Sequence, residues 1–303
     1  SAPASTAAAS TAATTETAAA TTSFSTAIVI DAVHAEQEEI EPILDRVLAE
    51  FHERRDGQPV AGVIGVFGGA AGLYELLVPK LRSIISDGVV RLASEEGCIL
   101  FDGGTASGVM EFVGTAVASL RATNIMDQAD VPYLVGCTPL ECADWPGRPN
   151  QPKGTWPAQL ESNHDMFILA SGESSHEWGA ETKLMMKLVA GASKKKGGGG
   201  CAVAVLSNGG AVTKKEALFS WRANIPLVLI EGSGRVTDKI CRLRRTLEEC
   251  AIRFGGSGSG GEKKKEKSTK MNNMWKRSVA SVVASFGGDV GIMLGEHEHG
   301  KKF

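Results

Sequence analysis

The sequence lacks the long apolar runs and the strong net charge that mark two large classes of protein. No stretch approaches the roughly 18 consecutive apolar residues that a membrane span requires. Lys and Arg number 32 against 35 Asp and Glu, so the formal net charge is −3, whereas binding to nucleic-acid phosphates calls for a basic surface. We therefore expect a soluble, intracellular and cytoplasmic chain that neither spans a membrane nor binds nucleic acid.

The cysteines lack the CxxC spacing that zinc sites and redox motifs use. Several of the six lie inside apolar runs, which favours reduced residues in a reducing compartment. We expect no metal site and no disulfide framework. The cysteines are Cys98, Cys137, Cys142, Cys201, Cys241 and Cys250.

Three segments lack the apolar content that a packed core needs. Residues 1–26 are almost all Ala, Ser and Thr, and they predict a disordered tail. The tail lacks the arginines of a transit peptide, although organellar targeting stays open. The Lys- and Gly-rich stretches 193–200 and 255–270 predict flexible surface insertions, with contacts to an acidic partner as the alternative. Residues 271–303 predict a C-terminal helix and tail that complete the domain.

Short apolar runs alternate with amphipathic helical patterns through residues 27–254. Continuous apolar strands separated by helices are typical of a parallel sheet that is covered on both faces. The predicted fold class is therefore α/β, a single Rossmann-like, doubly wound domain with a mostly parallel sheet of about six to seven strands. The strands are expected at 62–67, 98–101, 132–136, 166–170, 201–206 and 226–230.

The helical patterns carry two local expectations. Pro79 interrupts a helical pattern and predicts a break or a fresh helix start. The spacing of apolar residues predicts a helix over 178–189, which would place Glu177 and Glu181 one turn apart, either as an acid/base pair or as a solvated helix start.

Four of the predicted strands end in glycine-rich turns: GGAAG (68–72), DGGTASGVM (102–110), SNGG (207–210) and EGSGR (231–235). In an open parallel sheet the carboxyl ends of the strands share one edge, where ligands bind at the topological switch point. Backbone N–H groups reach an anion most closely where no Cβ intervenes, and the following helix adds its N-terminal dipole. The four turns therefore predict a phosphate-binding edge.

The predicted site combines backbone amides with a few side chains. Thr105 and Ser107 would add hydroxyl donors, Arg235 a bidentate guanidinium, and Asp238 a helix cap or a partner for a ribose hydroxyl. The predicted ligand- and phosphate-binding residues are Gly68, Gly69, Gly103, Gly104, Thr105, Ser107, Gly108, Asn208, Gly209, Gly210, Gly232, Ser233, Gly234, Arg235 and Asp238.

Two common nucleotide motifs are missing. There is no GxxxxGK[ST], which argues against a P-loop ATPase. There is also no GxGxxG with an acidic residue about 20 positions later, which argues against an ordinary NAD-dependent dehydrogenase.

The order of the motifs resembles the SLOG superfamily, and most closely its LSDAT branch, the domain found alone in microbes and at the amino terminus of melastatin-type TRP channels. The resemblance covers roughly residues 60–250 and implies a Rossmann-like sensor of a nucleotide-derived ligand such as ADP-ribose, with no required cofactor. The motifs that carry it are GGA (68–70), DGGTASGVM (102–110), LESNHDMFILAS (160–171), EWGAE (177–181), LSNGG (206–210) and PLVLIEGSGRVTDKI (226–240).

A distant enzyme branch of the same superfamily, the cytokinin-activating phosphoribohydrolases, carries PGGxGTxxE with a catalytic glutamate. Aligning the glycines of that motif with Gly103 and Gly104 puts Met110 at the position of the glutamate. A thioether cannot act as an acid or a base, so this departure argues against the hydrolase activity. Glu111 is one residue away, but about 100° round a helix.

Two rival functions stay open beside the sensor. The first is a nucleotide hydrolase that uses Glu181, Glu111 or His164 as its base, although His164 fits a structural histidine better than a catalytic one. The second is a partner-binding module without a ligand, which contacts its partner through the lysine-rich loops. Trp178 fits either adenine stacking or core packing, and assembly into a homo-oligomer stays open.

Overall fold

The computed structural model describes residues 26–31, 37–69, 72–123, 130–195 and 199–255. The tail predicted at 1–26, apart from Thr26, and the C-terminal segment predicted at 271–303 lie outside these residues. So does nearly all of the loop predicted at 255–270. The chain divides into two compact units after Val236, and helix α7 (Arg235–Gly255) runs from the first unit into the second.

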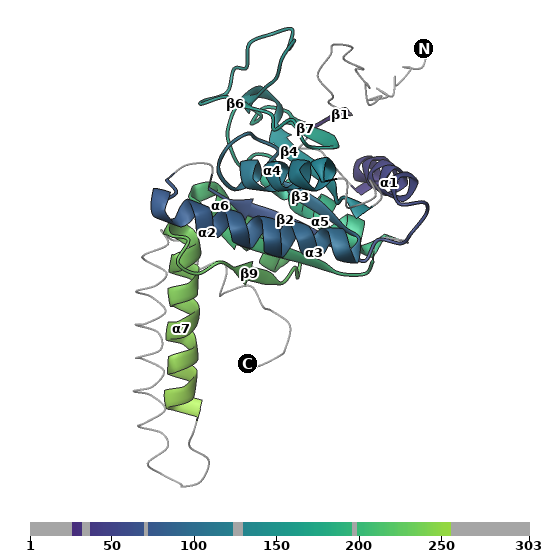
Figure 1. The fold of residues 1–303 in the computed structure, drawn as a ribbon. Helices are drawn as coiled ribbons and strands as arrows, with labels where there is room; N and C mark the ends of the chain where they lie inside the picture. The colour runs from purple at the N-terminus through teal and green to yellow at the C-terminus, as the bar shows by residue number, and fades with distance from the viewer. Residues whose placement is uncertain (1–25, 32–36, 70–71, 124–129, 196–198, 256–303) are drawn as a thin grey trace, which may run out of the picture. The chain divides into compact units, whose positions relative to one another are not determined.

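The first unit is built on one parallel sheet, with the order β1-β7-β4-β3-β2-β8-β9 and every neighbouring pair parallel. The predicted doubly wound α/β fold is therefore confirmed. Figure 1 shows the strands between their covering helices. The strands are β1 (Ala27–Asp31), β2 (Gly62–Gly68), β3 (Cys98–Asp102), β4 (Tyr133–Pro139), β7 (Met166–Ser171), β8 (Ala202–Ser207) and β9 (Leu227–Leu229).

All six predicted strands are present; five lie within one residue of their expected bounds, and β4 runs three residues past its predicted end, to Pro139. The seventh, β1, pairs with β7 at the edge of the sheet and was not among the strands predicted from the sequence. A short two-stranded sheet, β5 (Ala143–Asp144) with β6 (Ala158–Gln159), links the ends of the long loop after β4.

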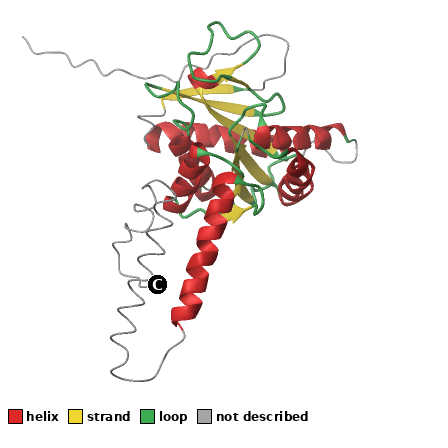
Figure 2. Cartoon of the chain, turned by 90° about the vertical axis from the view of Figure 1, so that its left-hand side faces the viewer, coloured by secondary structure: helices red, strands yellow, loops and turns green. Residues whose placement is uncertain are grey.

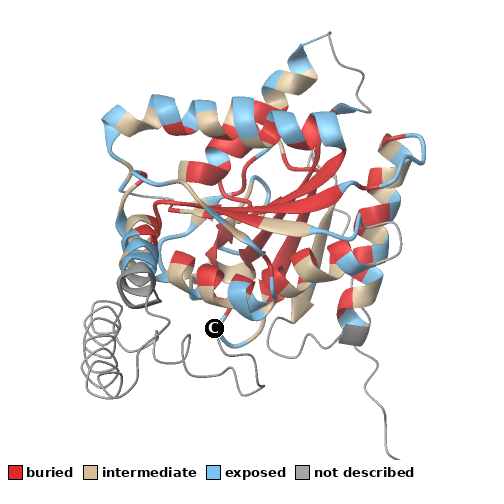
Figure 3. Cartoon of the chain, turned by 90° about the horizontal axis from the view of Figure 1, so that it is seen from below, coloured by how far each residue is buried: buried red, intermediate tan, exposed pale blue. Residues whose placement is uncertain are grey.

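Helices cover both faces of the sheet, as right-handed crossovers require. One layer holds α4 packed on η2 and β2, and the other holds α5 in contact with α1, α6 and β2. Figures 2 and 3 show the sheet between these layers, with its strands largely buried. The helices are α1 (Gln37–Arg54), η1 (Glu75–Leu77), α2 (Val78–Ser83), η2 (Ile84–Val90), α3 (Arg91–Glu96), α4 (Gly108–Ala122), η4 (Leu140–Cys142), α5 (Thr182–Lys194) and α6 (Ala211–Arg222).

Two helix boundaries test the local predictions. Helix α2 begins at Val78 with Pro79 in its first turn, so the fresh start predicted at Pro79 is confirmed. The helix predicted over 178–189 begins later, because Gly179 takes a φ of +92° and Glu181 is the N-cap residue. Glu177 and Glu181 therefore do not share a helix face, and that prediction was wrong.

The described cysteines are all free, and Cys201 alone among them is exposed. Within the described part of the chain, no helix combines the length and hydropathy that a bilayer crossing needs. The same residues contain no cluster of three or more His, Cys, Asp or Glu that could hold a metal ion.

Candidate anion-binding site

The four glycine-rich turns follow four neighbouring strands. Strands β3, β2, β8 and β9 are adjacent in the sheet, and because they are parallel their carboxyl ends lie on one edge. From β2 the chain moves to β3 on one side of the sheet and later returns to β8 on the other side. The topological switch point therefore lies between β2 and β8, where the Gly68 and Gly209 turns meet.

The turn after β8 presents open backbone amides at the start of α6. Asn208 and Gly209 both take positive φ values, 56° and 87°. Gly210 is the N-cap residue of α6, and no side chain caps this helix end. Among the described residues, the amides of Gly209 and Gly210 have no hydrogen-bond partner. Uncapped amides at the positive end of a helix dipole are donors that favour an anion.

Arg235 lies across the switch point. A Cβ placed on Gly210 would lie 2.8 Å from Arg235 Nη2, and one placed on Gly72 would lie 3.3 Å from Nη1. The guanidinium therefore lies between the turn after β2 and the turn after β8. Arg235 is a cationic side chain that the structure brings against two of the predicted glycine turns.

The turn after β9 is tied to the turn after β8. The Asn208 amide donates to Ser233 Oγ at 2.7 Å, and the Val236 amide donates to the Gly209 carbonyl at 3.3 Å. Gly232 and Gly234 take φ values of 83° and 101°, which an L side chain rarely adopts. These bonds fix the start of the chain segment that carries Arg235.

Gly68 serves close packing. Its Cβ would lie 2.4 Å from the Ser207 carbonyl oxygen and 2.9 Å from Val109 of α4. The Gly69 amide is bonded to that same Ser207 carbonyl. Gly68 and Gly69 thus bring the first turn of α4 close to the end of β8, and phosphate binding by these two residues stays a prediction.

Gly103 and Gly104 are held tightly against β4. The Gly104 amide donates to Asp102 Oδ1 at 2.6 Å, and Thr138 Oγ1 donates to the Gly103 carbonyl at 2.6 Å. A Cβ on Gly104 would lie 2.9 Å from Thr138 Oγ1. The Gly104 amide is therefore already used within the protein, and this turn owes its glycines at least partly to packing.

Two hydroxyl groups lie at the start of α4. Thr105 is buried, and its Oγ1 lies 3.0 Å from Ser107 Oγ. Ser107 is the N-cap residue, but its side chain makes no capping hydrogen bond, and Gly108 follows with a φ of 56°. A second helix N-terminus without a side-chain cap therefore lies on the same edge as α6.

A buried ion-pair network lies beneath the turn after β3. His164 Nε2 lies 2.7 Å from Asp102 Oδ1, and His164 Nδ1 lies 2.9 Å from Glu161 Oε2. The imidazole also stacks on Phe167, with ring centroids 5.1 Å apart. Asp102 holds the Gly104 amide as well, so the network fixes the conformation of the glycine turn.

The two carboxylates determine the protonation of His164. Burial alone lowers the pKa of His164, but Asp102 and Glu161 outweigh burial and raise it to about 10. Burial raises the pKa of Glu161, and the imidazolium outweighs burial and lowers it. With both ring nitrogens engaged and the side chain buried, His164 holds the structure together and has no nitrogen left to act as a base.

The other candidate bases differ in exposure. Glu111 is exposed on the first turn of α4, while Met110 beside it packs in the core. Glu181 is buried at the start of α5, where its Oε2 accepts the Gly179 amide at 2.8 Å. Burial raises the pKa of Glu181 to about 7, although hydrogen bonds from the backbone amides of Glu181 and Gly179 and the charge of Lys215 act to lower it.

Two further sequence candidates lie elsewhere. Trp178 donates through Nε1 to the Thr155 and Trp156 carbonyls, so it anchors the long loop after β4. Asp238 lies in the first turn of α7, past the boundary of the first unit, and its place in the site stays a prediction.

Sequence reasoning missed several residues near this edge. Asp102 and Glu161 are separated by 59 positions along the chain. Asp102 ends β3, whereas Glu161 and His164 lie in the turn before β7, and the order of the strands in the sheet brings the two carboxylates to the same histidine. Tyr74, 69% exposed, has its ring edge 3.9 Å from the Cβ position of Gly234. The signal in the sequence that could have identified Tyr74 is its position, two residues after the glycine-rich turn 68–72.

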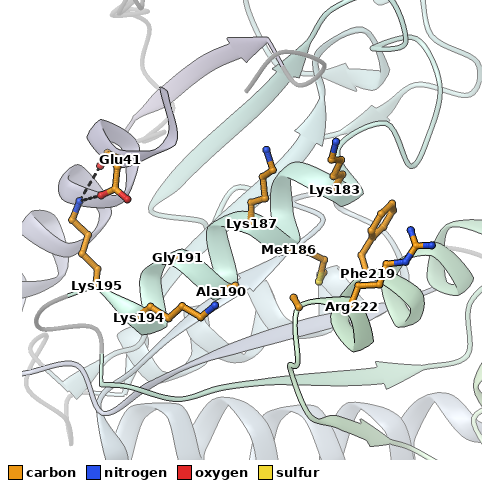
Figure 4. Close-up of a pocket in the computed structure, with 11 residues that line it drawn as sticks. Glu41, Lys183, Met186, Lys187, Ala190, Gly191, Lys194, Lys195, Phe219 and Arg222 are labelled. Carbon is orange, nitrogen blue, oxygen red and sulfur yellow. Dashed lines mark hydrogen bonds and ion pairs between the residues drawn. The ribbon is translucent and has the colours of Figure 1, made fainter. Parts of the chain in front are cut away.

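A cavity of about 600 Å³ lies on the outer side of α5 and α6, and Figure 4 shows its lining. Lys195 there contacts Glu41 and lies 2.9 Å from Asp45. None of the predicted site residues lines this basic groove. Its cationic lining residues are Lys183, Lys187, Lys194, Lys195 and Arg222.

Comparison with known proteins agrees with the motif order. The family model described as SLOG in TRPM, prokaryote, matches residues 61–270. Transient receptor potential cation channel subfamily M member 2 of Rattus norvegicus is 30% identical over 205 residues, which are 60% of this chain and 13% of that protein. The subfamily M member-like 2 protein of Nematostella vectensis is 26% identical over 201 residues, or 59% of this chain and 13% of that protein.

The chain therefore spans about an eighth of the length of these relatives. A solved structure titled TM1055 gives a TM-score of 0.40 at 18% identity, over 60% of this chain and 81% of that one. The family match covers more than half of the chain and includes all four glycine-rich turns. This chain belongs to the family described as SLOG in TRPM, prokaryote.

Proposed function

We propose that this domain binds a nucleotide-derived ligand of the ADP-ribose type at the carboxyl edge of its sheet. The observation that carries the proposal is the Arg235 guanidinium beside Gly210 and Gly72, next to the uncapped start of α6. A guanidinium and free helix amides together suit a phosphate, because they supply donors and positive charge at one point.

The width of the edge favours a ligand with more than one anchoring group. Strands β3 and β8 flank β2, so their ends lie roughly 10 Å apart at ordinary strand spacing. One phosphate cannot contact both uncapped helix starts, whereas a diphosphate joined to two sugars can reach from α6 to Ser107. Tyr74 offers an exposed ring beside the Gly234 turn, where a base can stack.

A thermal-shift screen tests the proposal. The full chain is heated with ADP-ribose, NAD, ADP, AMP and ribose 5-phosphate, each at several concentrations. A ligand at 100 times its dissociation constant adds about 2.7 kcal/mol to the free energy of unfolding. We expect ADP-ribose to raise the melting temperature more than AMP or ribose 5-phosphate does. No shift with any of these compounds would contradict the proposal.

The hydrolase alternative keeps Glu111 and Glu181 as candidate bases. Glu181 is the stronger of the two, because burial raises its pKa to about 7, near the value that suits general acid–base catalysis. Incubation with ADP-ribose, NAD and AMP, followed by chromatography, detects any released base, phosphate or ribose phosphate. Turnover by the wild type that Glu181→Gln abolishes would replace the binding function with an enzymatic one.

A further inference from the structure

Two buried carboxyl groups lie behind the β8 turn, where α5 and α6 pack together. Glu181 is the N-cap residue of α5, and Glu216 lies in the second turn of α6. Both side chains are buried, at 4% and 6% exposed. A Cβ on Gly179, two residues before Glu181, would lie 3.3 Å from both Val212 and Lys215 of α6, so the start of α5 packs directly on α6. Burial raises the pKa of Glu216, and the negative charge of Glu181 raises it further, so the two carboxyl groups act on each other.

Little surrounds the pair to neutralise two negative charges. Glu181 accepts hydrogen bonds from its own backbone amide and from that of Gly179, and the exposed Lys215 on α6 lies close enough to lower its pKa. The buried thiols of Cys137 in β4 and Cys142 in η4 also lie near its carboxyl group. Glu216 accepts a hydrogen bond from the Thr213 hydroxyl, and its Oε2 has no hydrogen-bond partner among the described residues.

Burial and mutual repulsion both disfavour the ionised form, so it is energetically costly for both carboxyl groups to be ionised near neutral pH. Burial raises the pKa of Glu181 to about 7. Burial, followed by the charge of Glu181, raises the pKa of Glu216 to about 8 against the effect of the Thr213 hydroxyl. The pair therefore loses its protons as the pH rises through about 7 to 8.

A short path joins this pair to the anion-binding turn. Thr213, the hydroxyl partner of Glu216, has its Oγ1 only 2.1 Å from the Cβ position of Gly209. Glu216 lies six residues after Gly210, which is about 9 Å along the α6 axis. At that separation, and with an effective dielectric constant of about 20, one negative charge weakens the binding of a second roughly tenfold or more.

We propose that the Glu181–Glu216 pair couples proton uptake to the binding of an anionic ligand at the start of α6. When a diphosphate binds beside Gly209 and Gly210, a carboxylate oxygen of the pair takes a proton from solvent, and it returns that proton when the ligand leaves. Affinity is then highest at low pH and falls as the pair ionises. This inference rests on the proposed function.

Isothermal titration calorimetry with ADP-ribose tests the coupling. Each phosphorus of ADP-ribose carries one ester bond and one anhydride bond, so the ligand lacks the ionisation near pH 6 of a phosphate monoester and keeps its charge across the range. Titrations at pH 6.0, 7.25 and 8.5, each in two buffers of different ionisation enthalpy, give both the dissociation constant and the number of protons taken up. The upper limit of 8.5 keeps His164 protonated.

The wild type is expected to bind about tenfold more weakly at pH 8.5 than at pH 6.0, with net proton uptake at pH 7.25. Glu216→Gln is expected to flatten the pH profile and to remove most of the uptake. Glu181→Gln removes the partner charge and serves in its place if Glu216→Gln does not fold. Glu177→Gln, an exposed acid in the preceding turn, is the matched control and keeps the wild-type profile.

The outcomes separate the two proposals. Binding that is equally tight at all three pH values, without proton uptake, overturns the coupling and leaves the ligand-binding function standing. A wild-type profile in both Glu216→Gln and Glu181→Gln does the same. No binding at any pH overturns both.

Discussion

Individual residues at the edge of the sheet divide into those that hold the fold and those that face the proposed ligand site. His164 belongs to the first group, because both of its nitrogens bind buried carboxylates. Arg235 belongs to the second, because it lies at the surface against two glycine turns. This division sets the expected effect of each substitution.

Replacing His164 by Ala leaves Asp102 and Glu161 buried without their shared cation. We expect a loss of about 3–5 kcal/mol in the free energy of unfolding, measured with urea, since an uncompensated buried charge is costly. His176→Ala, at an exposed position, is the control and should change stability by less than about 0.5 kcal/mol. A small effect of His164→Ala would mean that the network contributes little.

The pH dependence of this network follows from its pKa shifts. The pKa of His164 is raised from 6.5 to about 10, so its contribution to stability is complete below 6.5 and is lost as pH rises through 10. The pKa of Glu161 is lowered, so its contribution is complete above 4.5 and is lost as pH falls through its folded-state pKa. The network therefore stabilises most between pH 4.5 and 6.5.

Gly209 and Gly210 form a matched pair for substitution by alanine. At Gly209 a Cβ would lie 2.1 Å from Thr213 Oγ1 with a φ of +87°, so we expect a loss of about 1–3 kcal/mol in stability. At Gly210 the φ is −118°, and the near atom is the mobile end of Arg235. Gly210→Ala should keep the melting temperature and weaken ADP-ribose binding. Equal destabilisation by both substitutions would argue against this assignment.

At the scale of residues, the sequence indicates which side chains are candidates for a functional site, but it does not show which side chains they contact. The glycine turns and Arg235 could be named because each follows a readable strand. The partners of His164 could not, because Asp102 belongs to another strand and the contact depends on sheet order. The same holds for Glu216, whose acidic neighbour Glu181 lies on a different helix.

At the scale of elements, the apolar runs predicted six of seven strands because buried parallel strands are continuously apolar. β1 was missed because AIVID is short, lies at the edge and adjoins the Ala/Ser/Thr tail. The start of α5 was placed too early, since an amphipathic pattern does not reveal the positive φ of Gly179. Helix starts on this edge are therefore better located by glycine than by periodicity.

The carboxyl pair between α5 and α6 makes a stability prediction that needs no ligand. The pKa of Glu216 is raised from 4.5 to about 8, so its cost to the folded state is absent below 4.5 and grows until pH passes 8. Glu216→Gln should therefore melt higher than the wild type at pH 9, and that advantage should shrink at pH 5. An unchanged difference between the two pH values, followed by circular dichroism, would contradict the raised pKa.

At the scale of the whole molecule, the described residues offer two candidate places for an anion. One is the carboxyl edge with Arg235, and the other is the basic groove on α5 and α6. Overall charge cannot distinguish them, because the chain is nearly neutral. Sheet topology favours the edge, since strand ends and helix starts converge there.

Titration calorimetry with ADP-ribose on the wild type, Arg235→Ala and Arg222→Ala decides between them most directly. Arg222 lines the basic groove in the last turn of α6, at the opposite end of that helix from Gly210. We predict that Arg235→Ala weakens binding more than tenfold with folding intact, while Arg222→Ala leaves the dissociation constant unchanged. Unchanged affinity in Arg235→Ala, or a loss confined to Arg222→Ala, would contradict a phosphate site at the switch point.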